Sequence, residues 1–310
     1  MLARVLVIAL NTYREAVRAR ILHGLFALAL ATTGYSLVVG AYTSRNQLRV
    51  VSDLGAASIS LYAIIVAVVL GATSLYRELE LKTLFPILAR PISRAEYLAG
   101  KYLGTLLVLL VFVVANSGVV MLATGVIAGR SLAQALALGL GSAVLLGAVG
   151  YKRRRSLTYL PLVWAVILGV GGALLSAGAP DDRRVLLGLG VLTMCEVAIV
   201  AGFATLFSSF SSPFLTAVFT FAVFIVGRSA DTLARLPARV FGDTIHAIGV
   251  ALSKVVPNLM LYVPSRPLLT GEASDVALWP YVGHAALYAL GWSLLLLASA
   301  SIIFRRRDFI

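Results

Sequence analysis

Eight apolar runs follow one another along this chain, separated by short charged segments. They cover residues 21–42, 54–76, 97–127, 131–151, 157–177, 185–207, 213–227 and 281–304. A helix needs roughly 20 apolar residues to cross the hydrocarbon core of a bilayer, so the seventh run is short unless it continues past Arg228. The runs are continuous and do not alternate as membrane strands do. The pattern therefore predicts an all-α, polytopic transmembrane helical bundle.

Composition supports this interpretation. With 60% hydrophobic residues, 13% charged residues and a mean hydropathy of +0.96, a chain of 310 residues cannot hide its apolar surface in a soluble globule. The net charge of +13 could suggest a nucleic-acid partner, but the basic residues stand in short loops at the ends of apolar runs. This placement indicates membrane topology and lipid headgroups, so we expect no nucleic acid as a partner.

The distribution of Lys and Arg also predicts orientation. Most of them fall on one side if the amino terminus is cytoplasmic, and residues 152–155 are the strongest single indicator. Because these residues resist translocation in short loops, we expect a multi-pass protein of the inner (plasma) membrane with both termini in the cytoplasm.

Residues 1–20 are predicted to form an interfacial elbow helix. Arg4, Asn11, Glu15 and Arg18 fall on one stripe of a helix with 3.6 residues per turn, and most other positions are aliphatic. Such a helix lies in the headgroup plane with its apolar side toward lipid. Two alternatives are a plain extension of the first span and a signal peptide, although the apolar start is short and no small-residue cleavage site follows it.

The segment 77–96 holds the densest cluster of charged and turn residues in the chain. It is too polar to cross lipid, and it is predicted to begin with a short helix over residues 78–84 before prolines punctuate the path. We interpret it as a docking segment for a partner on one membrane face.

The end of this segment carries the signature of a helix start. Ser93 can accept a hydrogen bond from the amide of Glu96 while the Glu96 carboxylate reaches back, which is a capping box. Ile92 and Tyr97 are placed to form the accompanying hydrophobic staple.

Small residues recur every four positions in the fourth and fifth runs, at Gly139, Ala143 and Gly147 and at Ala165, Gly169, Ala173 and Ala177. Small side chains let helix backbones approach closely in lipid, so close helix contacts are predicted here. A glycine-rich span without a fixed partner is the alternative.

Residues 231–280 form the long segment on the far side of the membrane. Phe241, Ile245, Ile248, Leu252 and Val255 repeat at helical spacing and predict an amphipathic helix that ends near Pro257. We expect this extracytoplasmic helix to lie on the outer membrane surface.

One acidic residue, Glu196, falls deep inside an apolar run. A carboxylate in lipid is costly, so it should face the bundle interior and be paired or protonated. Proton coupling is one hypothesis. A structural hydrogen bond between helices is favoured over it, because no second intramembrane acid or base continues a relay.

No catalytic or cofactor site is expected in this chain. Gly100-Lys101 is followed by Tyr102 and lacks the upstream glycine of a phosphate loop, so the chain should not hydrolyse ATP itself. The three histidines are scattered and Cys195 is alone, which argues against a metal site.

Three segments, residues 78–84, 88–94 and 100–104, together resemble the cytoplasmic signature of type-two (ABC-2) ABC transporter permease subunits. Residues 207–213, 256–259 and 304–309 add similarity. The resemblance implies one permease domain over residues 1–310, with a six-span core and a coupling helix between the second and third spans. The chain departs from that plan in residues 128–184, which are predicted to add an inserted helix pair and give eight spans.

The resemblance also implies partners. Two copies of an ATP-binding subunit, which would hold ATP and Mg, are expected to drive two permease chains arranged as a homodimer. The implied contacts to that subunit are ionic for Glu78, Glu80 and Lys82, and apolar for Leu79, Leu81 and Leu84. The structure of the coupling segment is assigned to Pro91, Ser93, Arg94, Glu96, Gly100 and Lys101.

Export of a lipid-like or amphipathic substrate is the leading functional hypothesis. The alternative is a mechanotransmitter that drives an extracytoplasmic partner without moving cargo, as in the similar permeases of nitrous-oxide reductase maturation. An intramembrane enzyme or a lone secondary carrier is a third possibility, but no catalytic constellation or paired charges in the sequence favour it.

Overall fold

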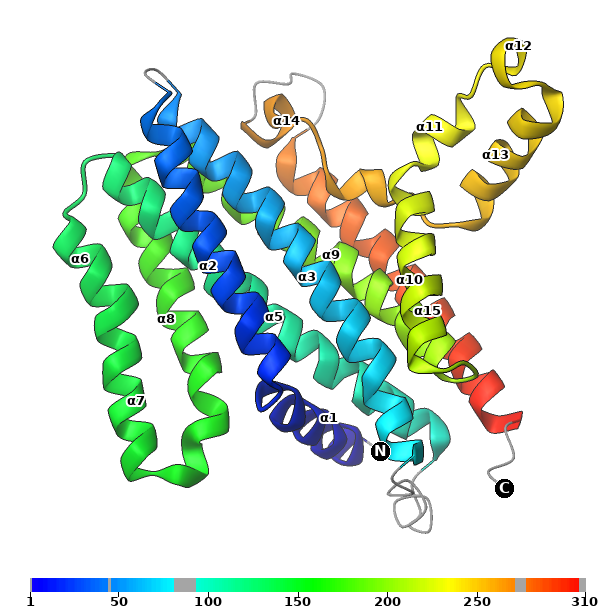
Figure 1. Ribbon diagram of the computed structural model, residues 1–310, viewed down its shortest axis with the longest axis horizontal. Coiled ribbons are helices and arrows are strands. Elements are labelled where there is room, and N and C mark those ends of the chain that lie inside the picture. The colour runs from blue at the N-terminus through cyan, green and yellow to red at the C-terminus, as the bar shows by residue number, and fades with distance from the viewer. Residues whose placement is uncertain (1, 44–45, 81–92, 271–276, 307–310) are drawn as a thin grey trace.

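The computed structural model describes residues 2–43, 46–80, 93–270 and 277–306, and gives only the backbone of residues 20, 74–80, 154–156, 238, 241 and 306 (Figure 1). All regular secondary structure in these ranges is helical, which confirms the predicted all-α class. The helices are α1 (Leu2–Val17), α2 (Arg20–Ala41), α3 (Gln47–Glu80), α5 (Arg94–Ile127), α6 (Leu132–Leu136), α7 (Ser142–Lys152), α8 (Leu160–Leu175), α9 (Pro180–Ser208), α10 (Pro213–Arg228), α11 (Ala230–Ala234), α12 (Ala238–Phe241), α13 (Asp243–Val255), α14 (Arg266–Thr270) and α15 (Leu278–Arg306). Short π or 3₁₀ turns are η1 (Ala137–Gly141), η2 (Arg154–Tyr159), η3 (Ser176–Gly178) and η4 (Leu259–Tyr262).

Seven of the described helical segments are long and apolar enough to cross a membrane. They are Ile21–Ala41, Gln47–Thr73, Arg94–Ile127, Leu132–Lys152, Leu157–Gly178, Pro180–Ser208 and Leu278–Arg305. The seventh apolar run forms α10, which has 16 residues and ends at Arg228. At about 1.5 Å per residue it is shorter than the roughly 30 Å hydrocarbon core, and α11 continues the chain after a break at Ser229.

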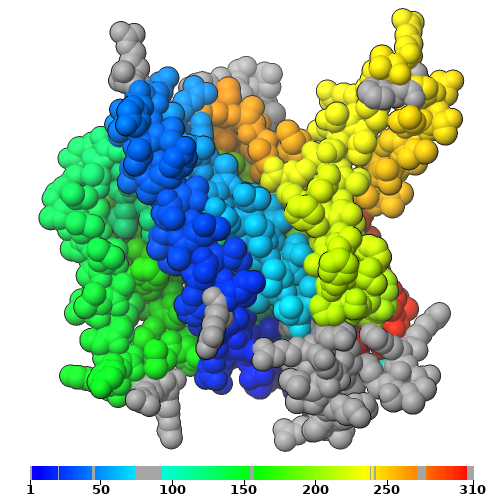
Figure 2. Space-filling model, in the orientation of Figure 1, coloured from blue at the N-terminus to red at the C-terminus, as the bar shows by residue number. Residues whose placement is uncertain are grey.

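The bundle is built around α3, α5 and α9, which pack on one another and supply many residues of the main hydrophobic core. α2, α10 and α15 pack against this centre, and α8 packs on α5. The start of α1 and the end of α15 lie at the same end of the bundle, and α11 to α13 lie at the opposite end (Figure 1). In the space-filling view the residues of α11 to α13 form an arm that stands away from the bundle (Figure 2).

The helix that carries the second span is longer than the sequence pattern predicts. Its apolar run stops at Tyr76, but α3 continues through Glu80 without a break. The expected separate short helix therefore does not begin at Glu78, because the backbone hydrogen bonds of the span extend into the polar residues. Likewise α5 joins the capped start at Arg94 and the third span in a single helix of 34 residues.

The small residues of the fifth run make the predicted close helix contacts, whereas Gly147 of the fourth run does not. Gly169 and Gly172 of α8 lie against α5, and a Cβ at Gly172 would stand 2.5 Å from the Gly118 carbonyl oxygen. Gly147 of α7 has no neighbour within 4 Å of such a Cβ. The close contact is thus between α5 and α8, and Gly147 leaves space in place of a helix contact.

Candidate coupling and transport site

The first turn of α5 is closed by the predicted capping box. The Glu96 amide donates to Ser93 Oγ at 3.2 Å, and the Ser93 amide donates to Glu96 Oε2 at 2.8 Å. Both bonds satisfy backbone donors that a helix start otherwise leaves without partners. The capping box is therefore confirmed. The predicted staple partner Ile92 lies outside the described residues.

Replacing Ser93 with Ala should lower the free energy of unfolding by about 1 kcal/mol, because one backbone amide loses its acceptor. Denaturant unfolding in detergent, followed by circular dichroism, measures this change. Ser131 is a matched control, since it is the N-cap of α6 but makes no side-chain cap hydrogen bond. Equal stability of the Ser93→Ala and Ser131→Ala variants would contradict the assigned role.

Arg94 ties the start of α5 to the end of α15. Its Nη1 donates to the carbonyl oxygens of Phe304 at 2.9 Å and Arg305 at 3.0 Å. A guanidinium suits this position because the last carbonyl groups of a helix lack backbone partners and carry partial negative charge. Tyr97 stacks on Phe304 with ring centroids 6.4 Å apart. The two helix ends therefore form one connected unit.

Helix α1 lies across the same end of α5. A Cβ at Gly100 would stand 2.6 Å from Ile8 Cβ, so glycine is needed for the close crossing. Lys101 is buried beneath α1, with its Nζ 3.7 Å from Glu15 Oε2. Gly100 and Lys101, which the sequence assigned to the coupling segment, thus join the segment's helix to the predicted elbow helix.

The predicted contacts to an ATP-binding subunit are only partly covered by the structure. Glu78, Leu79 and Glu80 continue α3, and their backbone alone is described. The others, Leu81, Lys82 and Leu84 together with Pro91, lie outside the described residues.

Glu196 is paired inside the bundle. Its carboxylate receives two hydrogen bonds from Arg228, Nε to Oε1 at 2.7 Å and Nη2 to Oε2 at 2.9 Å, and one from Ser60 Oγ at 3.3 Å. Arg228 Nη2 also donates to Ser60 Oγ at 3.1 Å. The predicted inward orientation is confirmed. A bidentate ion pair satisfies the buried carboxylate, which supports the structural role over the proton-coupling hypothesis.

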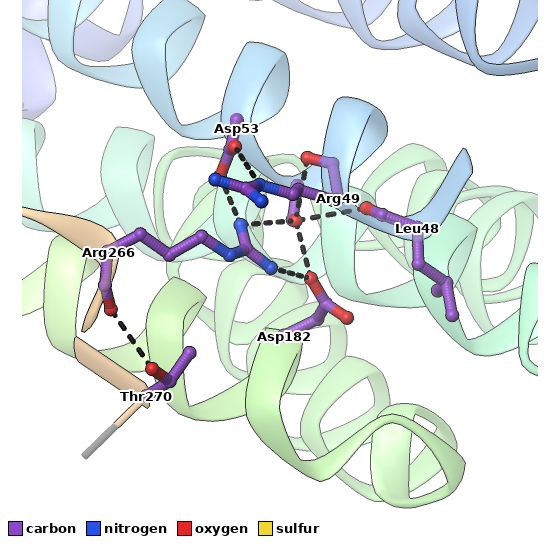
Figure 3. Close-up of polar contacts among 7 residues, drawn as sticks. Leu48, Arg49, Asp53, Asp182, Arg266 and Thr270 are labelled. Carbon is purple, nitrogen blue, oxygen red and sulfur yellow. Dashed lines mark hydrogen bonds and ion pairs between the residues drawn. The ribbon is translucent and has the colours of Figure 1, made fainter. Parts of the chain in front are cut away.

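A second ionic cluster joins three elements at the end of the bundle that bears α14 (Figure 3). Arg266 forms ion pairs with Asp53 of α3 and, through Nη2 at 2.6 Å, with Asp182 Oδ1 of α9. Ser52 Oγ donates to the same Asp182 oxygen at 2.7 Å, and Arg49 Nε lies 3.7 Å from Asp53 Oδ2. This cluster fixes α14 against the starts of α3 and α9.

The Glu196–Arg228 ion pair and the Arg266 cluster border one cavity of about 670 Å³ between α3, α9, α10 and η4. Arg228, Arg266 and Asp53 line it together with apolar side chains such as Leu61 and Phe224. Tyr262 contributes to the wall. Burial raises the pKa of its phenol well above the usual value, so the hydroxyl stays protonated and donates to the Ala285 carbonyl oxygen at 3.1 Å. The cavity combines apolar walls with ion-paired side chains of both charges, as an amphipathic ligand requires.

Sequence reasoning missed Arg228 and Arg266. Arg228 was recognised only as the possible limit of an apolar run, and its partner Glu196 lies 32 residues away. A cation at the end of a short apolar run, with one acid in the run before it, was the available signal. Nothing local marks Arg266, whose partner Asp182 is 84 residues distant.

These features define a multi-pass α-helical membrane protein. Residues 16–170, half of the chain, match the family model described as ABC-2 family transporter protein, and the chain belongs to this family. It is thus a transmembrane permease component of an ABC transporter, and the family implies an ATP-binding subunit as its partner. The match includes most of the helix pair over residues 128–184. Comparison with curated proteins gives no relative of this chain.

Proposed function

We propose that this chain couples ATP hydrolysis by a separate ATP-binding subunit to export of a lipid-like or amphipathic substrate. Two copies of that subunit carry ATP and Mg and act on a permease homodimer in the inner membrane. The segment 77–96 and both termini face the cytoplasm in this arrangement, and the permease itself performs no catalysis.

The observation that carries the proposal is the set of contacts at the start of α5. Arg94 binds the end of α15, and Gly100 and Lys101 join α5 to α1. A force applied to the segment between α3 and α5 would therefore move several helices together. Such rigid-body motion is the usual way in which ATP-driven closure is converted into a change of access.

The cavity beside Glu196 and Arg228 supports a lipid-like or amphipathic substrate. Its apolar walls favour hydrocarbon, and the ion-paired side chains of Arg228, Arg266 and Asp53 give it a polar part. A sugar would leave the apolar wall without complementary contacts. An amphipathic molecule satisfies both parts of the lining.

The test is a double charge reversal, Glu78→Arg with Glu80→Arg, in the permease co-purified with its ATP-binding subunit. We expect compounds that stimulate ATP hydrolysis in the unaltered complex to lose their effect, because the ionic contacts to the subunit become repulsive. Asp181→Arg with Asp243→Arg is the control, since it makes the same charge change at the opposite end of the bundle. Stimulated hydrolysis that survives the first change would refute the assigned contact.

Mechanotransmission is a second candidate, and the geometry of α13 favours it. Ile245, Ile248 and Val255 are exposed on this helix, which stands on the arm away from the bundle. An exposed apolar face of this kind is suited to an extracytoplasmic partner protein. If that function is correct, no small compound stimulates ATP hydrolysis, whereas Ile245→Asp or Ile248→Asp releases the partner.

A further inference from the structure

A second cavity, of about 640 Å³, lies at the end of the bundle where α1 meets the helix pair. It is bounded by the end of α1, the start of α2, α5, α7 and the start of α8. Its volume is within the roughly 300–1,000 Å³ of typical ligand pockets. It is separate from the cavity beside Arg228, because the two share no lining residue.

The walls of this cavity are apolar and partly aromatic. Phe26 lies between Trp164 and Phe112, with ring centroids 5.5 and 6.2 Å away. The Trp164 indole N–H already has acceptors, Ser142 Oγ at 3.1 Å and the Gly139 carbonyl oxygen at 3.3 Å. The wall therefore presents ring and aliphatic surface, which suits a hydrocarbon chain.

The polar side chains of this cavity are cationic or neutral. Arg18 and His23 line it, and none of its described lining residues is acidic. Arg18 is exposed, and in the described part of the chain no side chain forms an ion pair with it. The exposed Lys152 ends α7 at the same end of the bundle, and the exposed Arg153 follows it. The rim thus attracts an anion.

Of the two helices in residues 128–184, α8 has many more direct contacts with the rest of the bundle than α7 has. α8 packs tightly on α5, whereas the described contacts of α7 are chiefly with α8 and the adjoining turns η1 and η2. The cavity occupies the space between α7 and the α1–α2–α5 group, where Gly147 leaves room. A long apolar molecule in this space would contact both α7 and the α1–α2–α5 group.

We propose that this cavity binds an anionic glycerophospholipid from the adjacent leaflet, with one acyl chain against Phe26 and Trp164 and the phosphate at Arg18. The apolar walls and the cationic rim match the two halves of such a lipid. Free phosphate would leave the apolar walls empty, and a neutral hydrocarbon would leave Arg18 without a counter-charge. This site needs only the membrane location of the chain, so it stands apart from the proposed export activity.

Trp164 provides a probe inside the site. A variant with Trp279→Phe and Trp292→Phe retains Trp164 as its sole tryptophan, since the chain has three. Its fluorescence is measured in vesicles of phosphatidylcholine to which brominated-chain phosphatidylglycerol, or brominated-chain phosphatidylcholine, is added in steps. We expect quenching by the anionic lipid to saturate at a low mole fraction, and quenching by the zwitterionic lipid to rise gradually without saturation.

Two further substitutions locate the site. Gly147→Leu should remove the saturable quenching, because the new side chain enters the cavity, whereas Gly34→Leu on α2 is the control outside the lining with open space at its Cβ. Arg18→Gln should raise the mole fraction of anionic lipid at half-saturation about fivefold. This is the contribution of one basic residue near an anionic surface. Arg239→Gln at the opposite end should leave it unchanged.

Native mass spectrometry gives a second readout that needs no tryptophan replacement. The otherwise unaltered protein should retain an added phosphatidylglycerol that its Gly147→Leu variant loses. Quenching that is equal for the two brominated lipids, or retention that Gly147→Leu leaves intact, would overturn the proposal. Added inorganic phosphate should not displace the lipid, and displacement would show that the site selects the phosphate alone. These measurements use no ATP, so their failure would leave the export proposal standing.

Discussion

Replacing Arg228 with Met is expected to lower the free energy of unfolding by about 3 kcal/mol. The guanidinium makes two of the three side-chain hydrogen bonds that Glu196 receives, and the Glu196 side chain is only 1% exposed. Without Arg228 a buried carboxylate keeps Ser60 as its one described donor. Removing one partner of a buried ion pair costs more than removing both, because the remaining charge is left uncompensated.

The double variant Glu196→Gln with Arg228→Met tests that explanation. It should recover at least about 1 kcal/mol of the loss, since no unpaired charge remains. Denaturant unfolding in detergent micelles, followed by circular dichroism, gives the comparison. Arg235→Met is the control, because Arg235 is exposed and lies on the arm. An Arg228→Met variant as stable as this control would show that the pair contributes nothing to the fold.

Replacing Gly118 with Leu should separate α8 from α5 and destabilise the bundle by about 3 kcal/mol, the upper part of the range for overpacking. A Cβ at residue 118 would stand 2.4 Å from the Leu168 carbonyl carbon and 2.5 Å from its oxygen. Both neighbours are backbone atoms, so no change of rotamer relieves the clash. Helix association in lipid depends on such close packing, since no hydrophobic force acts between helices there.

The same substitution at Gly283 is the control for Gly118→Leu. Gly283 is exposed on α15, and nothing lies within 4 Å of a Cβ built there. Gly283→Leu should keep or slightly raise stability, because Leu has the higher helix propensity. Cysteine cross-linking between α5 and α8 adds a structural readout, and unchanged cross-linking in Gly118→Leu would contradict the predicted separation.

The predictions that the structure confirms depend on local physical chemistry. Ser93 and Glu96 are three residues apart, so their capping box needs nothing beyond the helix start that they form. Most of the predicted amphipathic helix is confirmed as Asp243–Val255, which ends where Pro257 approaches, whereas Phe241 lies in α12 because the chain turns at Gly242. The inward position of Glu196 followed from the cost of exposing a carboxylate to lipid.

The structure differs from the sequence pattern in how far one helix continues, and it supplies what the pattern left open, namely which helices meet. The pattern placed a helix boundary before Glu78, yet α3 runs on to Glu80, because a helix that is already nucleated extends easily through polar residues. Repeated small residues predicted close helix contacts without naming the partner helix, and the structure shows that Gly172 lies on Gly118 of α5. The spacing shows that one face of a helix is lined with small residues. It does not show which other helix packs on that face.

The sequence by itself determined that this protein is a helical membrane bundle, because long apolar runs must satisfy their backbone groups internally in lipid. Only the tertiary structure decided that Glu196 meets Arg228, that Arg266 joins Asp53 and Asp182, and that α7 stands off from α5 around a cavity. These contacts depend on the register of one helix against another. That register is set by side-chain packing between segments far apart in the chain, which a local pattern does not contain.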